Sequence, residues 1–501
     1  MKGDFSTQRF RSTKHYTRVL KQQGRVELDS DWNEQTAISQ HLLRTLIVDL
    51  LGRGGGPADR CGFGLADAAA EGLDPAVGDF VIGAGRYYVD GLLVENERAL
   101  FYSAQPELPA PPKLNAGKTY LAYLDVWERH VTYLDDPDIR EVALGGPDTC
   151  TRVKTTWQVR WLDAGAKVDP KDKAAIEQKI KTLQAEMDRA SEQLGTEKTA
   201  KKKAALKALI AKLGDQIENL EKELADAPDE APAAAPDCGE LLQPLRDWAS
   251  GTMAARLTPA DDAESPCVLP PESRYRGLEN HLYRIEVHAS GDTADANQVP
   301  TFKWSRDNGA VATRWLGTTG NDVTVASARD FAAGDWVEFT GAADDLASTP
   351  GPLTRIARID GDVMTVDAAP AWSKDRLNPT VRRWNQAAND QLTLTDGAIA
   401  ITPGTGDQGW IAIEDGLEVQ FTAGTYRSGD YWLIPARVAT GAIEWPMGAQ
   451  EAPLSLGPQG IEHHYAPLFM VEATGTSPFV SLVKDCRCRF APLPCLAADD
   501  V

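Results

Sequence analysis

Apolar residues recur at helical spacing between residues 31 and 51, which predicts an amphipathic helix whose apolar face packs on a core. The row of apolar positions is Ile38, Leu42, Leu46 and Leu50, flanked by Leu43, Ile47 and Leu51. Asp31 can cap the helix, with Glu34 three residues later completing a capping box. The Gly-rich segment 52–57 predicts its end and lacks the Lys-Ser/Thr that a phosphate loop needs.

Alternation of apolar and polar residues predicts strands over 79–162 and again from 275 to the end. The first region contains FVIGAGRYYVDGLLVEN, in which Asp90-Gly91 is a strong hairpin signal. The second region has further turn signals at Asn308-Gly309, Asp360-Gly361 and Asp415-Gly416. Its segments GDWVEFT and LTRIARIDGDVMTVD predict a small barrel-like unit near 320–370.

A different period appears between 171 and 225, where apolar residues step by four and three in two heptad rows. The rows are Ile176, Ile180, Leu183, Met187, Ala190 and Leu194, then Leu206, Ile210, Leu213, Ile217, Leu220 and Leu224. They are out of phase by two residues and separated by a polar stretch. An antiparallel helical hairpin is therefore favoured, and a continuous rod is the alternative.

The predicted fold class is mainly β, with an inserted antiparallel coiled-coil hairpin and an N-terminal helix, in several domains. The expected division has five parts. They are an N-terminal docking module (1–65, helix 31–51), a β domain (66–166), the helical hairpin (167–226), an acidic Pro/Ala linker with a short helix (227–270) and a β-rich C-terminal region (271–501).

Charge separates the N-terminus from the rest of the chain. The net charge of −21 argues against non-specific nucleic-acid binding, which needs concentrated Lys and Arg. Residues 1–25, however, hold seven Lys/Arg and one acidic residue, Asp4. Such a basic arm suits docking on an acidic protein surface, although a solvated surface strand is equally compatible. The candidate docking residues are Arg9, Arg11, Lys14, Arg18 and Lys21.

Compartment signals are absent from the sequence. No apolar run follows the first Lys, and no stretch approaches the 18 apolar residues of a membrane-spanning helix. The seven cysteines are then expected to be reduced thiols of a protein made in the cytoplasm. Export would follow from assembly into a particle and cell lysis.

Candidate chemistry is weak, so we expect no enzyme, no cofactor and no metal. His463 and His464 are adjacent, and neighbouring strand residues point to opposite faces. Cys486, Cys488 and Cys495 lack zinc-knuckle spacing. The Asp135-Asp136-Pro-Asp138 segment lacks the calcium-loop pattern, and no G-x-S-x-G, H-E-x-x-H or Walker motif occurs. Thirteen Trp permit a glycan-binding platform, but core packing is the default.

The N-terminal block MKGDFSTQRFRSTKHYTRVLKQQGRVELDSDWNEQ combines a basic arm, a predicted strand-turn-strand unit and a helix start. The unit consists of a β-like segment over 16–20, a Gln-Gln-Gly-Arg turn and a second segment over 25–28. It resembles the opening module of bacterial proteins encoded with contractile phage-tail-like injection systems. Further blocks are similar to the same family. They are YLDVWERHVTYLDDPDIREVALGGPDT, YRGLENHLYRIEVH with FKWSRDNGAV, LEVQFTAGTYRSGDYWLIPAR, and GIEHHYAPL with DCRCRFAPL.

The resemblance implies a structural or accessory component of such a particle, at its baseplate or in a fibre-like appendage. The implied partners are baseplate, tube or sheath proteins, with no nucleic acid and no direct membrane insertion. Two alternatives stay open: a module on the particle that binds a surface glycan, or a cargo protein that the particle carries. No catalytic residue is implied.

Overall fold

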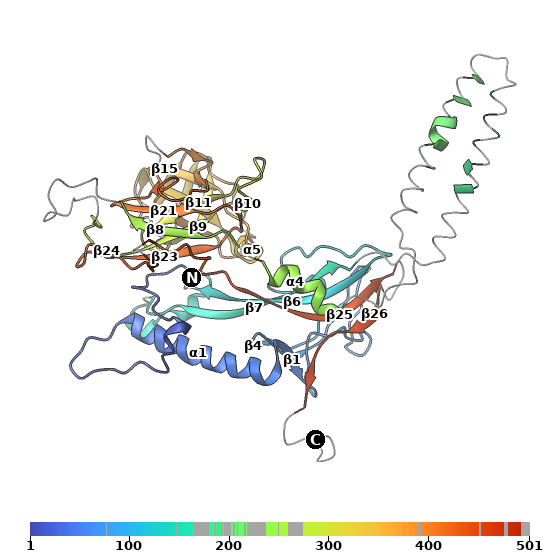
Figure 1. Cartoon of the computed structure of the whole chain (residues 1–501), viewed down its shortest axis with the longest axis horizontal. Coiled ribbons are helices and arrows are strands. Elements are labelled where there is room, and N and C mark those ends of the chain that lie inside the picture. Colours follow the sequence, from blue (N-terminus) through green and yellow to red (C-terminus); the bar gives the residue numbers. More distant parts are fainter. Residues whose placement is uncertain are drawn as a thin grey trace.

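Most of the molecule consists of two β-rich bodies, with helix α1 (Asp29–Leu51) running along the first of them (Figure 1). The computed structural model describes residues 1–76, 78–146, 148–164, scattered positions between 180 and 217, and residues 237–248, 250–258, 274–373, 375–387, 392–449, 452–474 and 479–491.

The first body joins strands from both halves of the chain. Its sheets have the orders β26-β25-β6-β7, β27-β1-β3-β4 and β2-β5. The strands are β1 (Gly54–Pro57), β2 (Val81–Ile82), β3 (Gly85–Val89), β4 (Leu92–Asn96), β5 (Leu100–Phe101), β6 (Thr119–Val131), β7 (Arg152–Asp163), β25 (His463–Ala473), β26 (Val480–Asp485) and β27 (Arg489–Phe490). Because β25 pairs with β6 from His463↔Trp127 to Glu472↔Thr119, the chain's last strands complete its first body.

The predicted Asp90-Gly91 hairpin is confirmed. Val89 of β3 pairs with Leu92 of β4, and the two residues between them have φ of 44° and 81°. A two-residue loop with both φ values positive matches the twist of the flanking strands, and Asp-Gly adopts it at low steric cost.

The second body is built on two facing sheets of orders β18-β19-β11-β9-β23-β24 and β20-β21-β8, with the pair β10-β22. Their strands are β8 (Met253–Leu257), β9 (His281–Val287), β10 (Gly291–Asp292), β11 (Thr301–Ser305), β18 (Leu394–Thr395), β19 (Ala398–Ala400), β20 (Ile411–Ala412), β21 (Leu417–Phe421), β22 (Thr425–Tyr426), β23 (Tyr431–Arg437) and β24 (Ala442–Ile443). Side chains from both sheets share one core, which includes Trp304 and Trp432. These two tryptophans are core residues and offer no exposed platform for a sugar.

A closed barrel of order β12-β13-β16-β15-β14-β17 extends the second body, where the sequence predicts a barrel-like unit near 320–370. Its strands are β12 (Ala312–Thr319), β13 (Asp322–Val325), β14 (Trp336–Thr340), β15 (Leu353–Asp360), β16 (Val363–Val366) and β17 (Thr380–Trp384). Short helices complete the described elements: η1 (Ser12–Lys14), η2 (Tyr102–Ala104), η3 (Pro137–Ile139), η4 (Val142–Leu144), α4 (Cys238–Arg246) and α5 (Ala342–Ala347).

The predicted fold class needs correction. The described elements form a β-rich protein with few helices, and no coiled-coil hairpin is among them. The heptad segment assigned to it, 167–226, lies for the most part outside the described residues. Heptad spacing predicts a helical face, but it does not supply the partner that would cover that face.

The N-terminal predictions also need correction. No strand occurs within residues 1–28, because the segments over 16–20 and 25–28 have no ladder partner. The amide of Val19 instead donates to Oε1 of Gln35 at 2.7 Å. Helix α1 begins at Asp29, so Asp31 is not its cap. Asp29 instead accepts hydrogen bonds from the amide and hydroxyl of Ser6, at 2.9 and 2.6 Å.

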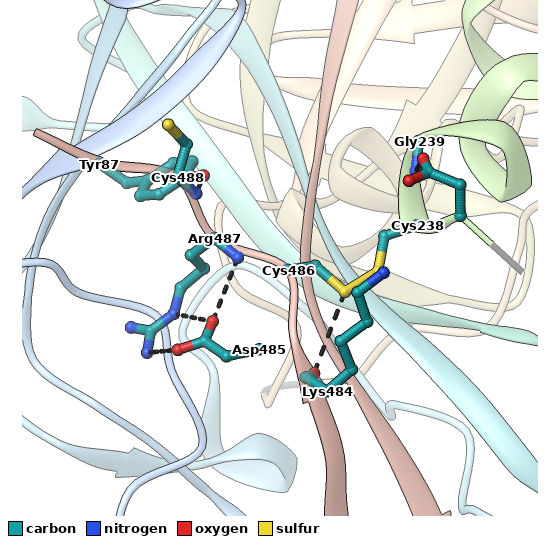
Figure 2. Close-up of a disulfide and its surroundings, with 9 residues drawn as sticks. Tyr87, Cys238, Gly239, Lys484, Asp485, Cys486, Arg487 and Cys488 are labelled. Atoms are coloured by element: carbon teal, nitrogen blue, oxygen red, sulfur yellow. Dashed lines mark hydrogen bonds and ion pairs between the residues drawn. A yellow bond between two sulfur atoms is a disulfide. The ribbon is translucent and has the colours of Figure 1, made fainter. Parts of the chain in front are cut away.

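The expectation of reduced thiols is wrong for one pair of cysteines. Cys238 in α4 and Cys486 after β26 form a disulfide, with their Cα atoms 6.2 Å apart across 248 residues of sequence (Figure 2). Helix α4 packs on β25, and this contact places the two residues together. Cys61, Cys150 and Cys488 are free, while Cys267 and Cys495 lie outside the described residues.

Candidate functional site

The first residues of the chain are packed into the second body and do not form a loose arm. The Met1 amino nitrogen donates to the Tyr431 hydroxyl at 2.7 Å, and Asn308 Nδ2 donates to the Gly3 carbonyl at 2.9 Å. Phe5 packs against the buried cluster of Leu282, Tyr431 and Leu433. The predicted basic arm is therefore two segments: an anchored part over 1–7 and an exposed part over 8–28.

The side-chain amine of Lys2 lies in a buried cluster of opposite charges. This cluster joins the anchored segment to strands β9 and β11 of the second body and to the barrel. Its Nζ lies 3.0 Å from Glu286, which is 2.5 Å from Arg284 and 3.3 Å from Lys303. Lys303 also lies 2.6 Å from Glu338 of the barrel strand β14. Burial acts to raise the pKa of Glu286, but Lys2, Arg284 and Lys303 outweigh it and hold that pKa well below its usual range. All these charges are paired, so the cluster is structural.

The exposed segment carries the five predicted docking residues in different settings. Arg9 forms an ion pair with Asp31 at 3.2 Å, and Lys21 with Glu27 at 2.6 Å. Within the residues that the structure describes, Arg11, Lys14 and Arg18 form no ion pair. Their charges are thus uncompensated on a chain that is strongly acidic.

A groove of about 560 Å³ brings three of these cations together with an apolar wall. Arg9, Arg11 and Lys14 belong to its lining, while Arg18 and Lys21 do not. The apolar lining comes from the exposed segment and the β23–β24 region of the second body: Tyr16, Leu433, Pro435, Trp445 and Pro446. Two segments more than 400 residues apart in sequence therefore form one surface feature.

The outward side of α1 carries exposed leucines, contrary to the prediction that the apolar face of this helix packs on a core. Ile38 is 1% exposed, but Leu43, Leu46 and Leu50 are 57%, 54% and 71% exposed. Trp32 and Leu42 are exposed as well. Leu43, Leu46 and Leu50 step by three and four, which is the spacing of a helix-packing seam. Toward the start of the helix the same row continues through Ser39 and Thr36 to Trp32, so its apolar part is the C-terminal half.

Sequence reasoning missed the exposed face and the groove wall for different reasons. The leucine pattern was visible, but a pattern cannot tell a face that its own chain covers from one that a partner covers. The contribution of Leu433 and Trp445 left no signal in the sequence, since only the fold places them beside residues 9–16.

The candidate metal ligands have separate partners. His463 Nδ1 lies 2.6 Å from Asp125, and His464 Nδ1 lies 3.1 Å from Asp90. Asp136 caps the short helix η3 by accepting from the amide of Asp138. Among the residues described, no group of three or more His, Cys, Asp or Glu side chains could hold a metal ion.

A second cavity, of about 230 Å³, lies between the two bodies and is lined by both charge signs. His130 lies in its wall, where burial and then the Met1 amino group, Arg382 and Arg284 lower its pKa to about 3. Burial raises the pKa of Asp345 on the same wall.

No helix within the described part of the chain is both long enough and apolar enough to cross a membrane.

Comparison with known proteins identifies a family but no function. The model of DUF6519, a family of unknown function, matches residues 1–499. No curated protein matches the chain. Among solved structures, the crystal structure of TssK is similar at 12% sequence identity, covering 84% of this chain and 99% of that chain, with a TM-score of 0.15. This similarity is weak, and a TM-score of that size does not establish a common fold.

Proposed function

We propose that this chain, which belongs to the family DUF6519, is a structural or accessory component of a contractile phage-tail-like injection particle. The N-terminal block and four further blocks resemble proteins of such systems and span most of the chain outside the heptad segment and linker. The protein would be made in the cytoplasm and assembled at the baseplate or in a fibre-like appendage, beside other particle proteins. Its role would be non-enzymatic.

The observation that carries this proposal is the uncovered face of α1. Leu43, Leu46 and Leu50 lie in one row on the outside of a well-formed helix, and each is more than half exposed. Rows of exposed large apolar side chains at packing spacing mark protein–protein contact sites. Uncompensated cations at Arg11, Lys14 and Arg18 on the adjoining segment would attract an acidic neighbour before the apolar contact forms.

The test is incorporation into the native particle. Wild-type protein is expected to copurify with sheath and tube proteins, and the double variant Leu43→Glu/Leu46→Glu is expected to lose incorporation while remaining folded. Leu278→Glu is a matched control, because Leu278 is 95% exposed and lies in the second body. Failure of the wild-type protein to copurify would reject the particle role; normal occupancy of the double variant would reject α1 as the contact.

A further inference from the structure

The groove beside residues 9–16 is lined by three cations, of which only Arg9 has an acidic partner among the described residues. Arg9 forms an ion pair with Asp31, whereas Arg11 donates to the carbonyl of Phe10 at 3.1 Å and has no carboxylate partner in the part of the chain that the structure describes. Lys14 Nζ lies 5.7 Å from the centre of the Tyr16 ring and forms no ion pair among the described residues.

The acidic residues of the same groove do not cancel this charge. Glu444 is held by Arg437 at 2.6 Å and accepts from the Thr7 hydroxyl at 3.4 Å. Glu34 is the other carboxylate in the lining. Among the described residues, Arg11 and Lys14 then remain without an acidic partner, against Glu34 as the one unpaired carboxylate of the lining. The groove therefore attracts negative charge.

The part of the lining that comes from the second body is largely apolar, with Gln459 and Glu444 as its polar members. Leu433 and Trp445 are buried core residues that reach the groove. The indole N–H of Trp445 already donates to the Leu454 carbonyl at 2.9 Å, so its ring presents carbon. Pro435 and Pro446 have no backbone N–H to offer. Such a wall is suited to an apolar side chain or a proline.

We propose that this groove binds an extended acidic segment of a partner protein, with an apolar residue on the Leu433–Trp445 wall and carboxylates on Arg11 and Lys14. The charge of the groove selects an acidic partner. Leu433, Pro435 and Pro446 have no flat aromatic ring on which a base could stack, so this lining favours a peptide over a nucleic acid. The inference rests on the proposed particle role only in that the segment would belong to a neighbouring particle protein.

The probe is a fluorescein-labelled twelve-residue synthetic peptide of Glu and Asp with one central Leu-Pro pair, measured by fluorescence anisotropy with the full chain. Arg11→Glu/Lys14→Glu is expected to weaken binding at least tenfold, and raising the salt concentration should narrow this difference because screening removes the attraction. Replacing the Leu-Pro pair of the peptide by Ser-Ser is expected to weaken binding to the wild-type chain.

Arg98→Glu/Arg329→Glu is the matched control, because both arginines are exposed and lie outside the groove. It should bind the peptide as the wild type does. Equal binding by the groove variant, equal binding of the Ser-Ser peptide, or equal binding of a single-stranded DNA oligonucleotide of the same charge would each overturn the proposal. If the wild-type protein enters the particle but does not bind the peptide, the proposal of a peptide-binding groove is rejected and the proposed particle role stands.

Discussion

At the residue scale, burial sets how much each charged side chain contributes to stability. The same side-chain type is a surface charge in residues 8–28 and a member of a buried pair in the Lys2–Glu286 cluster. Isolated surface pairs contribute little, whereas removing one partner of a buried pair leaves a charge without water or counterion. Burial also keeps His130 neutral, because burial and the neighbouring cations lower its pKa and so oppose protonation of the ring.

His130 should make the protein sensitive to acid. Its folded pKa of about 3 lies below its unfolded value of 6.5, so the fold favours the neutral imidazole. Stability is then complete above pH 6.5 and is lost as the pH falls toward the folded pKa. Between pH 6.5 and 4.5 this amounts to roughly 2–3 kcal/mol, at about 1.4 kcal/mol per pKa unit.

Urea denaturation at these two pH values measures the effect. His130→Gln, which retains a polar partner for Thr151, should flatten much of the pH dependence. A residual slope is expected from His288, whose pKa burial and Lys303 lower to about 4. The exposed His15→Gln should behave as the wild type. An unchanged slope in His130→Gln would contradict the assignment.

At the element scale, packing partners decide whether an amphipathic helix is part of the core. Helix α4 is covered by β25 and tied to the end of β26 by the Cys238–Cys486 disulfide. Helix α1 is longer, 23 residues against nine, but its buried residues are only Ser30 and Ile38. Sequence pattern therefore predicts that a helix has an apolar face, and the contacts decide which residues of that face are buried.

Reduction of the disulfide should destabilise the docking of α4. Cross-linking residues 248 positions apart restricts the unfolded chain, and native disulfides typically contribute about 2–5 kcal/mol. Chemical denaturation with and without reductant should show this difference, and Cys238→Ser should match the reduced wild type. Cys150→Ser, at an exposed free thiol, should not change the midpoint. Equal midpoints for oxidised and reduced protein would show that the cross-link contributes nothing.

At the scale of the whole molecule, chain order and spatial order differ. Strand β25 returns to the first body and pairs with β6, while residues 1–7 cross to the second body. The buried cluster then connects the anchored N-terminus, strands β9 and β11, and the barrel through Glu338. The two sheets and the barrel are thus expected to unfold together.

Lys303→Ala should test that coupling. It leaves Glu286 and Glu338 buried with one counterion fewer, and breaking a buried pair of this kind costs about 3–5 kcal/mol. Calorimetry should show one transition at lower temperature. Lys21→Ala, at the exposed pair with Glu27, is the control and should not shift the transition. A variant in which only the barrel melts early would show that the cluster does not couple the units.

The sequence by itself determined the features that depend on neighbouring residues. Alternation predicted β structure, Asp90-Gly91 predicted a hairpin, and the leucine pattern predicted a helix that the structure has at 29–51. It also determined the basic segment and three of the groove cations, because the charge of each side chain follows from its residue type.

Tertiary structure decided everything that depends on distant partners. It paired Cys238 with Cys486, placed residues 1–7 in the second body, and left the segments over 16–20 and 25–28 without a strand partner. It also left the outer leucines of α1 uncovered and brought Trp445 to the basic groove. The physical reason is that local sequence sets backbone preference and side-chain periodicity, whereas burial and pairing depend on which segments meet in space.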